Sequence, residues 1–306
     1  MNATASKPLR LAVIGAGVMG KRHIAAAKRI GAPIVAMVDA DAAQAKAGAE
    51  MAGCPAFTDS ASLIGKADAA VIAVPTGAHV PIAAPLLKAG IGCLVEKPLA
   101  ATEAECRQLI AAATEGRAVL QVGHIERFNP AIETLAHAGL PPASMLAIAA
   151  RRMSASSARV LDIDVVMDLM VHDIDVVLTL KKTPVARVSA RGSDDHAVAL
   201  IGFADGTTAT LTASRVTATR IRDLDVVTPD AFFHVDYAAR TASKSRRRDS
   251  GQFEVSDLAV TGTDALNAQL EGFLASVRGD KAPRVSGEDA LATMILTAQI
   301  RAALKA

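Results

Sequence analysis

A glycine-rich turn near the start of the chain constrains the fold more than any other feature of the sequence. The turn spans residues 15–20 and reads Gly-Ala-Gly-Val-Met-Gly. A short apolar segment at residues 9–14 precedes it, and residues 19–30 follow it with apolar and basic side chains at helical spacing. A second apolar segment, residues 34–38, ends at Asp39. This order predicts a strand, a turn, a helix and a second strand, which together form one βαβ unit.

The glycines of this turn and the acidic residue after it are typical of a dinucleotide-binding site. The first glycine permits a tight turn, the second lets a pyrophosphate approach the backbone, and the third allows the helix to pack closely on the strand. The start of the helix also offers free N–H groups to the phosphates. We therefore predict a bound dinucleotide cofactor, held by Gly15, Gly17, Val18, Met19, Gly20 and Asp39.

Asp39 indicates which dinucleotide is preferred. It stands about 20 residues beyond the turn, where the ribose hydroxyls of the cofactor would lie. Its carboxylate can accept hydrogen bonds from both hydroxyls, whereas a 2′-phosphate would bring negative charge against it. Residues 40–42 contain no arginine that could compensate. The sequence therefore favours NAD over NADP.

Length, charge and cysteine content limit the class of protein. The chain has 306 residues, of which 51% are apolar, and this length fits two domains of ordinary size. The formal net charge is only +2, so neither nucleic acid nor a membrane is expected as a partner. The chain has no uncharged apolar run long enough to span a bilayer. Its three cysteines lack metal-like spacing, which predicts reduced thiols, no metal site and a cytoplasmic location.

Residues 1–122 are predicted to form a Rossmann domain, which is a doubly wound parallel sheet of the α/β class. Apolar segments at residues 69–74, 93–95 and 119–122 alternate with helical patterns, as is typical of a parallel sheet covered on both faces. Ligands of such sheets bind outside the carboxyl ends of the strands. We therefore expect further cofactor contacts from residues that follow two of these strands, namely Pro75, Thr76, His79, Glu96 and Lys97.

Lys97 follows one of these strands and stands between Glu96 and Pro98. Taken alone, a lysine in this setting is more often a solvated surface charge. At a strand end over a nicotinamide, however, an ammonium group can donate to a substrate hydroxyl or carbonyl and stabilise developing negative charge. We therefore predict that Lys97 contacts the cofactor and the substrate and takes part in catalysis.

Residues 123–306 are predicted to form an α+β domain that binds the substrate and carries a large, mainly antiparallel sheet. From residue 146 onward, several short strands follow one another without intervening helices. The last helix, at residues 288–304, is expected to pack back on the first domain. The crossing into this domain carries three candidate substrate-binding residues, His124, Arg127 and Asn129. For His124, an ordinary histidine at a domain boundary is an equal alternative.

A helix predicted at residues 164–180 carries a second constellation. Asp168, His172 and Asp175 have the spacing i, i+4 and i+7, which places them on one face of a regular helix. The residues around them are mostly apolar, so each of these polar groups needs a partner. A structural network of hydrogen bonds is the simpler interpretation. Downstream of a dinucleotide fold we favour catalysis, with His172 accepting a proton and Asp168 orienting its imidazole.

The sequence resembles the Gfo/Idh/MocA oxidoreductases over nearly its whole length. The resemblance rests on residues 15–20, on residues 74–79 and on Glu96-Lys97-Pro98-Leu99, whose distance from the glycine turn is the specific part. It implies that Lys97 lies by the nicotinamide and the substrate. It also implies that Pro75, Thr76 and His79 form a loop that lines the cofactor site. In the second domain it implies a catalytic motif made by Asp168, His172 and Asp175.

Two further expectations come from this resemblance. Residues 123–130 and 167–175 are most similar to the UDP-N-acetylglucosamine 3-dehydrogenase branch of the family, although Met170 stands where the family commonly has glycine. Family members frequently bury the free face of the second-domain sheet against another subunit, which implies a homodimer or homotetramer.

The favoured function is NAD-dependent oxidation of a secondary alcohol of a sugar to a ketone, with C3 of UDP-N-acetylglucosamine as the favoured position. Alternatives are a dehydrogenase or reductase of a free sugar or inositol, and a non-catalytic dinucleotide-binding regulator. A basic run at residues 244–248 is interpreted as a solvated loop. Its alternative is contact with a phosphate group, a role that Arg127, Arg151 and Arg152 could share.

Overall fold

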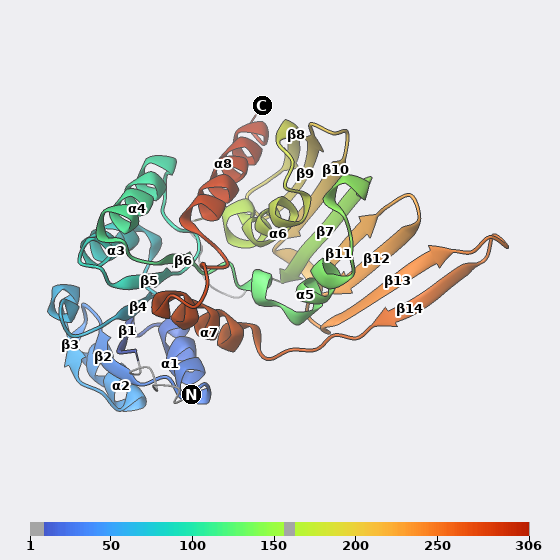
Figure 1. Cartoon of the computed structure of the whole chain (residues 1–306). Helices are drawn as coiled ribbons and strands as arrows, with labels where there is room; N and C mark the ends of the chain where they lie inside the picture. Colours follow the sequence, from blue (N-terminus) through green and yellow to red (C-terminus); the bar gives the residue numbers. More distant parts are fainter. Residues whose placement is uncertain (1–8, 156–162, 306) are drawn as a thin grey trace. The chain divides into compact units, whose positions relative to one another are not determined.

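The computed structural model describes residues 9–155 and 163–305, which fall into two compact units (Figure 1). The first unit comprises the described residues up to His124 together with Leu266–Leu291. The second comprises the described residues from Ile125 to Ala265 and those from Ala292 onward. The domain limits predicted from the sequence, 1–122 and 123–306, do not include this exchange of C-terminal segments, and residues 1–8 lie outside the described part.

The first unit contains a six-stranded parallel sheet in the order β3-β2-β1-β4-β5-β6. Its strands are β1 (Leu11–Ile14), β2 (Ile34–Val38), β3 (Ala56–Phe57), β4 (Ala69–Ile72), β5 (Gly92–Val95) and β6 (Leu120–Val122). Its helices include α1 (Val18–Arg29), α2 (Ala42–Ala52), α3 (His79–Lys88) and α4 (Glu103–Gly116). In Figure 1, α3 and α4 lie on one side of the strands, and α1 and α2 lie on the other. The predicted doubly wound parallel sheet is therefore confirmed.

Local sequence signals explain where these helices begin and end. Asp41 accepts hydrogen bonds from the N–H groups of Ala43 and Gln44 and so caps the start of α2, while Gly53, with a φ of 75°, ends it. Thr102 and Glu105 form a reciprocal capping box at the start of α4. Both helices pack on a sheet whose central strands β1 and β4 are completely buried, as the uniformly apolar sequences of those strands predict.

The second unit is built on an eight-stranded sheet in the order β14-β13-β12-β11-β7-β10-β9-β8. Its strands are β7 (Ala147–Ala155), β8 (Val185–Gly192), β9 (His196–Phe203), β10 (Thr208–Ser214), β11 (Val216–Val227), β12 (Ala231–Asp236), β13 (Thr241–Arg247) and β14 (Phe253–Leu258). All neighbouring pairs are antiparallel except β7 and β10, which run parallel. The prediction of a mainly antiparallel sheet is confirmed.

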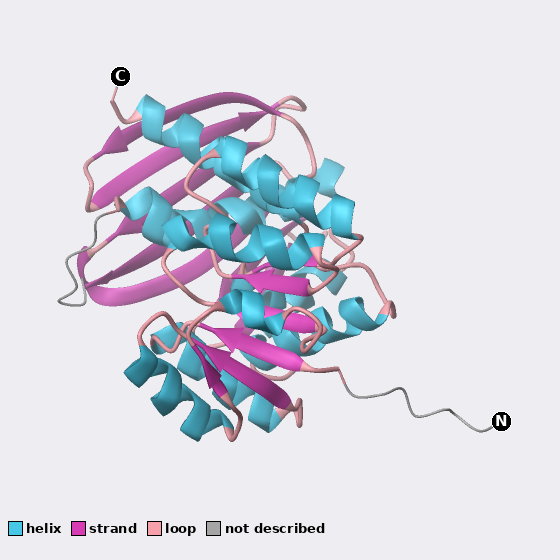
Figure 2. Ribbon diagram, turned by 90° about the vertical axis from the view of Figure 1, so that its left-hand side faces the viewer, coloured by secondary structure: helices cyan, strands magenta, loops and turns pink. Residues whose placement is uncertain are grey.

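Helices cover one face of this sheet (Figure 2). The core under them is formed by alternate strand residues, such as Ala199 and Ile201 of β9, while the intervening Leu200 is exposed. Helices α5 (Pro130–His137) and α6 (Val171–Lys181) contribute most of their apolar side chains to this core. The core of the second unit therefore lies between one face of the sheet and the helices that cover it.

The two C-terminal helices differ in the compact unit to which they belong. Helix α7 (Ala265–Arg278) packs in the first unit, where Val277 lies against Gly92 so closely that a β-carbon there would be 2.6 Å from its Cγ2. In α8 (Gly287–Ala303), the first five residues group with the first unit, whereas Leu296 and Ile300 belong to the core of the second. Packing of the whole last helix on the first domain stays a prediction.

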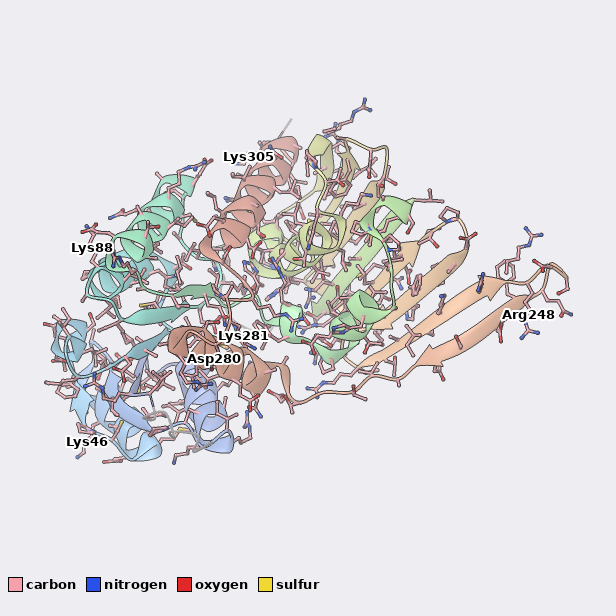
Figure 3. The ribbon with its side chains drawn as sticks, viewed as in Figure 1. Lys46, Lys88, Arg248, Asp280, Lys281 and Lys305 are labelled. Carbon is pink, nitrogen blue, oxygen red and sulfur yellow. The ribbon has the colours of Figure 1, made fainter. Side chains whose placement is uncertain are left out.

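The basic run is not a loop, and that interpretation was wrong. Lys244 to Arg247 lie in β13, which pairs with β12 on one side and β14 on the other. The alternation that marks a strand is present, because Ala242 is buried and the ammonium group of Lys244 lies over the ring of Phe233 at 5.3 Å. Charged side chains are common near sheet edges, where they hinder unwanted pairing. Arg248 lies just beyond the strand, near the far end of the hairpin (Figure 3).

Candidate active site

The glycine turn between β1 and α1 has the geometry of a phosphate-binding turn. Gly15 has a φ of 97°, and a β-carbon there would lie 2.3 Å from the carbonyl oxygen of Ala73. At Gly20, a β-carbon would lie 1.7 Å from the carbonyl oxygen of Gly15. Gly17 differs, because a β-carbon there would meet no atom within 4 Å. The first and third glycines are therefore needed for packing, while the second leaves open space for a ligand.

A cavity of about 730 Å³ lies in front of this turn, at the carboxyl ends of β1, β2 and β4. This volume suits a cofactor-sized ligand. Of the predicted cofactor contacts, the residues that line the cavity are Gly15, Gly17, Val18, Asp39 and Pro75. Those that do not line it are Met19, Gly20, Thr76, His79, Glu96 and Lys97. The lining includes the first two glycines of the turn and Asp39, which are expected to meet the pyrophosphate and the ribose, so the cavity fits NAD.

Asp39 is oriented by the backbone around it. Its Oδ2 accepts a hydrogen bond of 2.7 Å from the N–H of Ala16, and its Oδ1 accepts one of 3.0 Å from the N–H of Asp41. Each carboxylate oxygen has a second lone pair, so both can still accept from ribose hydroxyls. Lys21 is the cationic residue among the lining side chains. This arrangement agrees with a preference for a ribose without a 2′-phosphate.

His79 supports the cofactor loop from within the fold. Its ring is buried, with Nε2 at 3.0 Å from the carbonyl oxygen of Val74 and Nδ1 at 3.1 Å from that of Leu99. Val74 lines the cavity. The ring of His79 therefore holds together the segments that follow β4 and β5. We interpret His79 as a residue that positions the cofactor loop and not as a direct cofactor contact.

Glu96 and Lys97 follow β5 directly. Nε2 of the buried His23 lies 2.7 Å from Oε1 of Glu96, and the other carboxylate oxygen accepts a 3.3 Å hydrogen bond from the N–H of Lys97. Glu96 thus links α1 to the backbone of the candidate catalytic lysine. His23 was not predicted as a site residue from the sequence, although it lies in the helix that follows the glycine turn.

The helix carrying Asp168 and His172 is not regular, which corrects the prediction of one helical face. Residues Val166–Met170 form a π-helical turn, and α6 begins only at Val171. A π-turn shifts side chains relative to regular helical spacing and often occurs at functional sites. Asp164 starts this turn, because its Oδ1 accepts hydrogen bonds from the N–H groups of Val166 and Met167.

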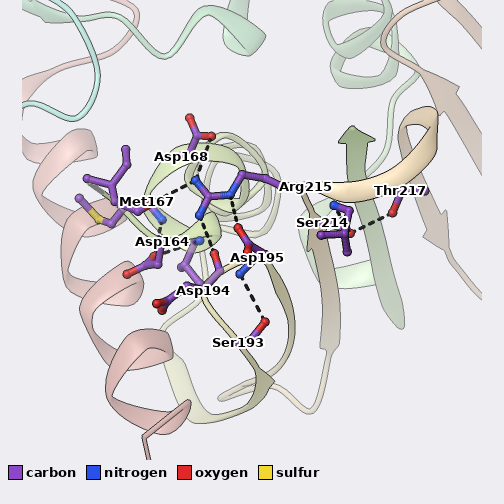
Figure 4. A network of polar contacts seen from close by, with 12 residues as sticks. Asp164, Met167, Asp168, Ser193, Asp194, Asp195, Ser214, Arg215 and Thr217 are labelled. Carbon is purple, nitrogen blue, oxygen red and sulfur yellow. Dashed lines mark hydrogen bonds and ion pairs between the residues drawn. The ribbon is translucent and has the colours of Figure 1, made fainter. Parts of the chain in front are cut away.

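Arg215 faces this turn and was missed by the sequence analysis (Figure 4). Its guanidinium donates to the carbonyl oxygens of Ile163 and Asp194 and to Oδ1 of Asp195. Its Nη1 also lies 3.9 Å from Oδ2 of Asp168. Arg215 therefore connects the π-turn and the residues before it with the link between β8 and β9, and it neutralises part of the charge of Asp168. No local sequence signal connects it with Asp168, because the partners are far apart in the chain.

Two acidic residues of α6 form buried ion pairs. Asp175 accepts two hydrogen bonds from Arg127, of 2.9 and 3.1 Å, and Asp173 accepts two of 2.9 Å from Arg152. Arg152 also donates to Glu126 at 2.9 Å. Burial alone lowers the pKa of Arg152, but the charges of Asp173 and Glu126 raise it well above its ordinary value. Asp175 is thus a structural partner, and His172 and Asp168 are the candidates for chemistry.

The residues predicted at the domain crossing are engaged in internal contacts. Asn129 is buried, its Oδ1 accepts from the N–H of Ala131 at the start of α5, and its Nδ2 donates to Glu126 and to the carbonyl oxygen of Tyr237. These bonds occupy the side chain, so we no longer count Asn129 as a substrate-binding residue. His124 is also buried. Its role and that of Arg127 toward a substrate stay predictions.

The described residues contain no group of three or more His, Cys, Asp or Glu side chains that could hold a metal ion. The cysteines are free thiols, and burial raises the pKa of Cys106 to about 11. No helix within residues 9–155 and 163–305 is long and apolar enough to cross a membrane.

Comparison with known proteins agrees with this geometry. Residues 9–124 match the oxidoreductase family with an NAD-binding Rossmann fold, GFO/IDH/MocA, and residues 149–228 match the GFO/IDH/MocA C-terminal domain. UDP-N-acetylglucosamine 3-dehydrogenase from Acidithiobacillus ferrooxidans is 33% identical over 97% of this chain and 98% of that protein. Inositol 2-dehydrogenase 4 from Saccharopolyspora erythraea is 32% identical over 70% of this chain and 66% of its own length.

Comparison with a solved structure shows that the similarity extends to the fold. The structure of UDP-N-acetylglucosamine 3-dehydrogenase GnnA from Acidithiobacillus ferrooxidans superposes with a TM-score of 0.92 at 31% identity and covers 97% of both chains. The match therefore includes the six-stranded and the eight-stranded sheet. Together with the cavity at the glycine turn, these findings show that the chain belongs to the GFO/IDH/MocA family of NAD-dependent oxidoreductases.

Proposed function

We propose that this protein oxidises C3 of UDP-N-acetylglucosamine to the 3-keto sugar, with NAD as the hydride acceptor. The observation that carries the proposal is the full-length similarity to a UDP-N-acetylglucosamine 3-dehydrogenase, which extends through the second unit where the substrate would be recognised. The inositol 2-dehydrogenases match either a smaller part of the chain, at 32% identity over 70%, or nearly the whole chain at the lower identity of 27%. Fold alone does not decide a substrate, so the extent of the match in the second unit matters most.

The cofactor supplies the acceptor for the hydride when it is bound at the glycine turn. Oxidation of a secondary alcohol also requires the hydroxyl proton to leave as the hydride leaves the carbon. We assign the proton to His172, since a neutral imidazole can accept a proton at physiological pH. Lys97 donates from its ammonium group to the same substrate oxygen and stabilises the negative charge that develops on it. The products are a ketone, the reduced cofactor and a proton.

Asp168 is proposed to orient His172 and to stabilise its protonated form. Its position in the π-turn, beside Arg215 at 3.9 Å, supports this role because the turn and the arginine together restrict where its carboxylate points. Arg215 is then a positioning residue that acts through Asp168.

The free thiols support a reducing compartment such as the cytoplasm.

We also propose that the sheet of the second unit pairs with a second copy of the chain. The strand registers place five exposed apolar side chains on the face opposite the helices: Leu200, Val227, Phe232, Phe253 and Val255. Phe253 is 70% exposed and Val255 is 67% exposed in the single chain, which is unusual for two large apolar side chains on one face of the same strand, β14. A homodimer or homotetramer would cover them. Sedimentation of a monomer at micromolar concentration would reject this arrangement.

The substrate is tested by measuring NADH formation with NAD and one of three compounds, which are UDP-N-acetylglucosamine, free N-acetylglucosamine and myo-inositol. A reagent that traps ketones is added, because it removes the product and drives an unfavourable oxidation forward. The proposal predicts NADH with the nucleotide sugar alone. NADH from myo-inositol but not from UDP-N-acetylglucosamine would overturn the substrate and leave the dehydrogenase assignment intact.

A further inference from the structure

A nucleotide sugar carries a diphosphate, and a protein that binds it usually supplies cationic donors. Three of the arginines that the sequence offered for this purpose are already paired within the second unit. Arg127 is bonded to Asp175, Arg151 to Asp223, and Arg152 to Asp173 and Glu126. Each of these guanidinium groups has its charge balanced by a carboxylate. The fold therefore uses them for its own stability, and a phosphate needs another partner.

Arg222 is a cation of a different kind. It lies in β11 opposite Arg152 of β7, on the sheet face that carries Leu224 and Val226 into the core. Its side chain is half-buried, and its Nε is excluded from solvent without a hydrogen-bond partner. The rest of its guanidinium has no hydrogen bond to any residue in the part of the chain that the structure describes. A partly buried guanidinium without hydrogen bonds is uncommon, because its desolvation is not compensated.

The charges around Arg222 make this position unfavourable in the absence of a ligand. Burial, together with the positive charges of Arg152 and Arg220, lowers the pKa of Arg222. The two nearby carboxylates, Glu126 and Asp173, already bond to Arg152. Glu126 and Asp173 attract Arg222 electrostatically but leave its guanidinium without a hydrogen bond among the described residues. Residues that cost stability in this way are often kept because they serve function.

The location of Arg222 connects it with the proposed chemistry. Arg152, its partner across the strands, holds Asp173, which directly follows His172 at the start of α6. All of these residues belong to the second unit. An anion bound by Arg222 would therefore lie on the same face of the sheet as the beginning of α6, on the side of the proposed proton acceptor.

We propose that Arg222 binds a phosphate oxygen of the diphosphate in the nucleotide-sugar substrate and so determines the preference for nucleotide sugars over free sugars. This inference rests on the proposed function. The planar guanidinium suits the task, since it can donate two parallel hydrogen bonds to a phosphate group.

The test compares wild type with Arg222→Met and Arg222→Lys. Loss of hydrogen bonds to a charged group lowers affinity by about 10- to 100-fold, so Arg222→Met should raise the Kd for UDP, measured by calorimetry, and the KM for UDP-N-acetylglucosamine by this factor. Arg222→Lys keeps the charge and should recover part of the affinity. The Kd for NAD should not change in either variant. Arg246→Met is the matched control, because it removes an exposed cation from β13 of the same sheet and should leave all three constants unchanged.

Thermal melting separates binding from a structural role. Because the side chain of Arg222 makes no hydrogen bond to any described residue, Arg222→Met should melt at the temperature of wild type or above it. A clearly lower melting temperature that Arg222→Lys restores would show a structural cation and overturn the inference. Unchanged UDP affinity in Arg222→Met would also overturn it.

The two proposals fail in distinguishable ways. If wild type oxidises UDP-N-acetylglucosamine and Arg222→Met does so with an unchanged KM, the function stands and the inference falls. If wild type does not oxidise this sugar but binds UDP through Arg222, the inference stands and the substrate assignment falls. If wild type neither binds UDP nor oxidises UDP-N-acetylglucosamine, both are wrong.

Discussion

Two glycines of the same turn should respond in opposite ways to the same substitution. A β-carbon at Gly20 would lie 1.7 Å from the oxygen and 2.9 Å from the carbon of the Gly15 carbonyl, so Gly20→Ala forces the turn and α1 apart. A β-carbon at Gly17 would meet no atom within 4 Å, and Gly17 has a φ of −68°, which alanine adopts without strain. The first change should damage the fold and the second should not.

The magnitudes follow from these distances. Overpacking against backbone costs up to about 3 kcal/mol. With roughly 2–4 °C lost per kcal/mol in a protein of this size, Gly20→Ala should lower the melting temperature by about 6–12 °C. Gly17→Ala should leave it unchanged. Its methyl group instead enters the cavity where the pyrophosphate would lie, and a clash costing about 1–3 kcal/mol weakens NAD binding roughly 5- to 150-fold.

Both quantities are accessible with purified protein. Melting is followed by circular dichroism without ligand, and the Kd for NAD is measured by calorimetry at a temperature where both variants are folded. Each variant serves as the control for the other. Normal NAD affinity in Gly17→Ala would show that the cofactor does not approach this turn, and a wild-type melting temperature in Gly20→Ala would show that the described packing is incorrect.

Three other predictions concern cofactor choice, chemistry and stability. Asp39→Ala should narrow the difference between the KM values for NAD and NADP, and a wild type that uses NADP equally well would contradict the role of Asp39. Lys97→Ala and His172→Ala should each lower kcat by about 100-fold or more while the Kd for NAD persists, and near-normal turnover would remove that residue from the mechanism. Arg152→Met should lower the free energy of unfolding by about 3–5 kcal/mol, because it leaves buried carboxylates without a partner. Arg151 pairs with Asp223 but is half-exposed, so Arg151→Met should lower the free energy of unfolding far less. Equal losses of stability in the two variants would contradict this explanation.

The parts of the fold that local sequence determines were predicted closely. The strand predicted at residues 34–38 coincides with β2, and helix α2 follows it. Neighbouring residues set the limits of α2, with Asp41 at its start and Gly53 at its end. The helix expected between residues 95 and 119 is α4, and its start, marked by Thr102 and Glu105, was not located in the sequence.

Other features depend on contacts that sequence does not reveal. The π-turn at Val166–Met170 was predicted as regular helix, because its apolar pattern fits a helical period and its shape depends on Asp164 and Arg215. Strand β13 was interpreted as a loop because its charges hide the alternation around Ala242. The ion pairs of Arg127, Arg151 and Arg152 could not be predicted either, since each joins a carboxylate distant in the chain. A role of these arginines toward a phosphate stays a prediction.

The central claim is that a hydride leaves C3 of UDP-N-acetylglucosamine and is transferred to NAD. The most direct test uses UDP-N-acetylglucosamine deuterated at C3 and determines the mass of the NADH formed, with the sugar deuterated at C4 as the control. The account predicts deuterated NADH from the first compound and ordinary NADH from the second. Ordinary NADH from the C3-deuterated sugar, or no NADH from either compound in the presence of a ketone trap, would contradict it.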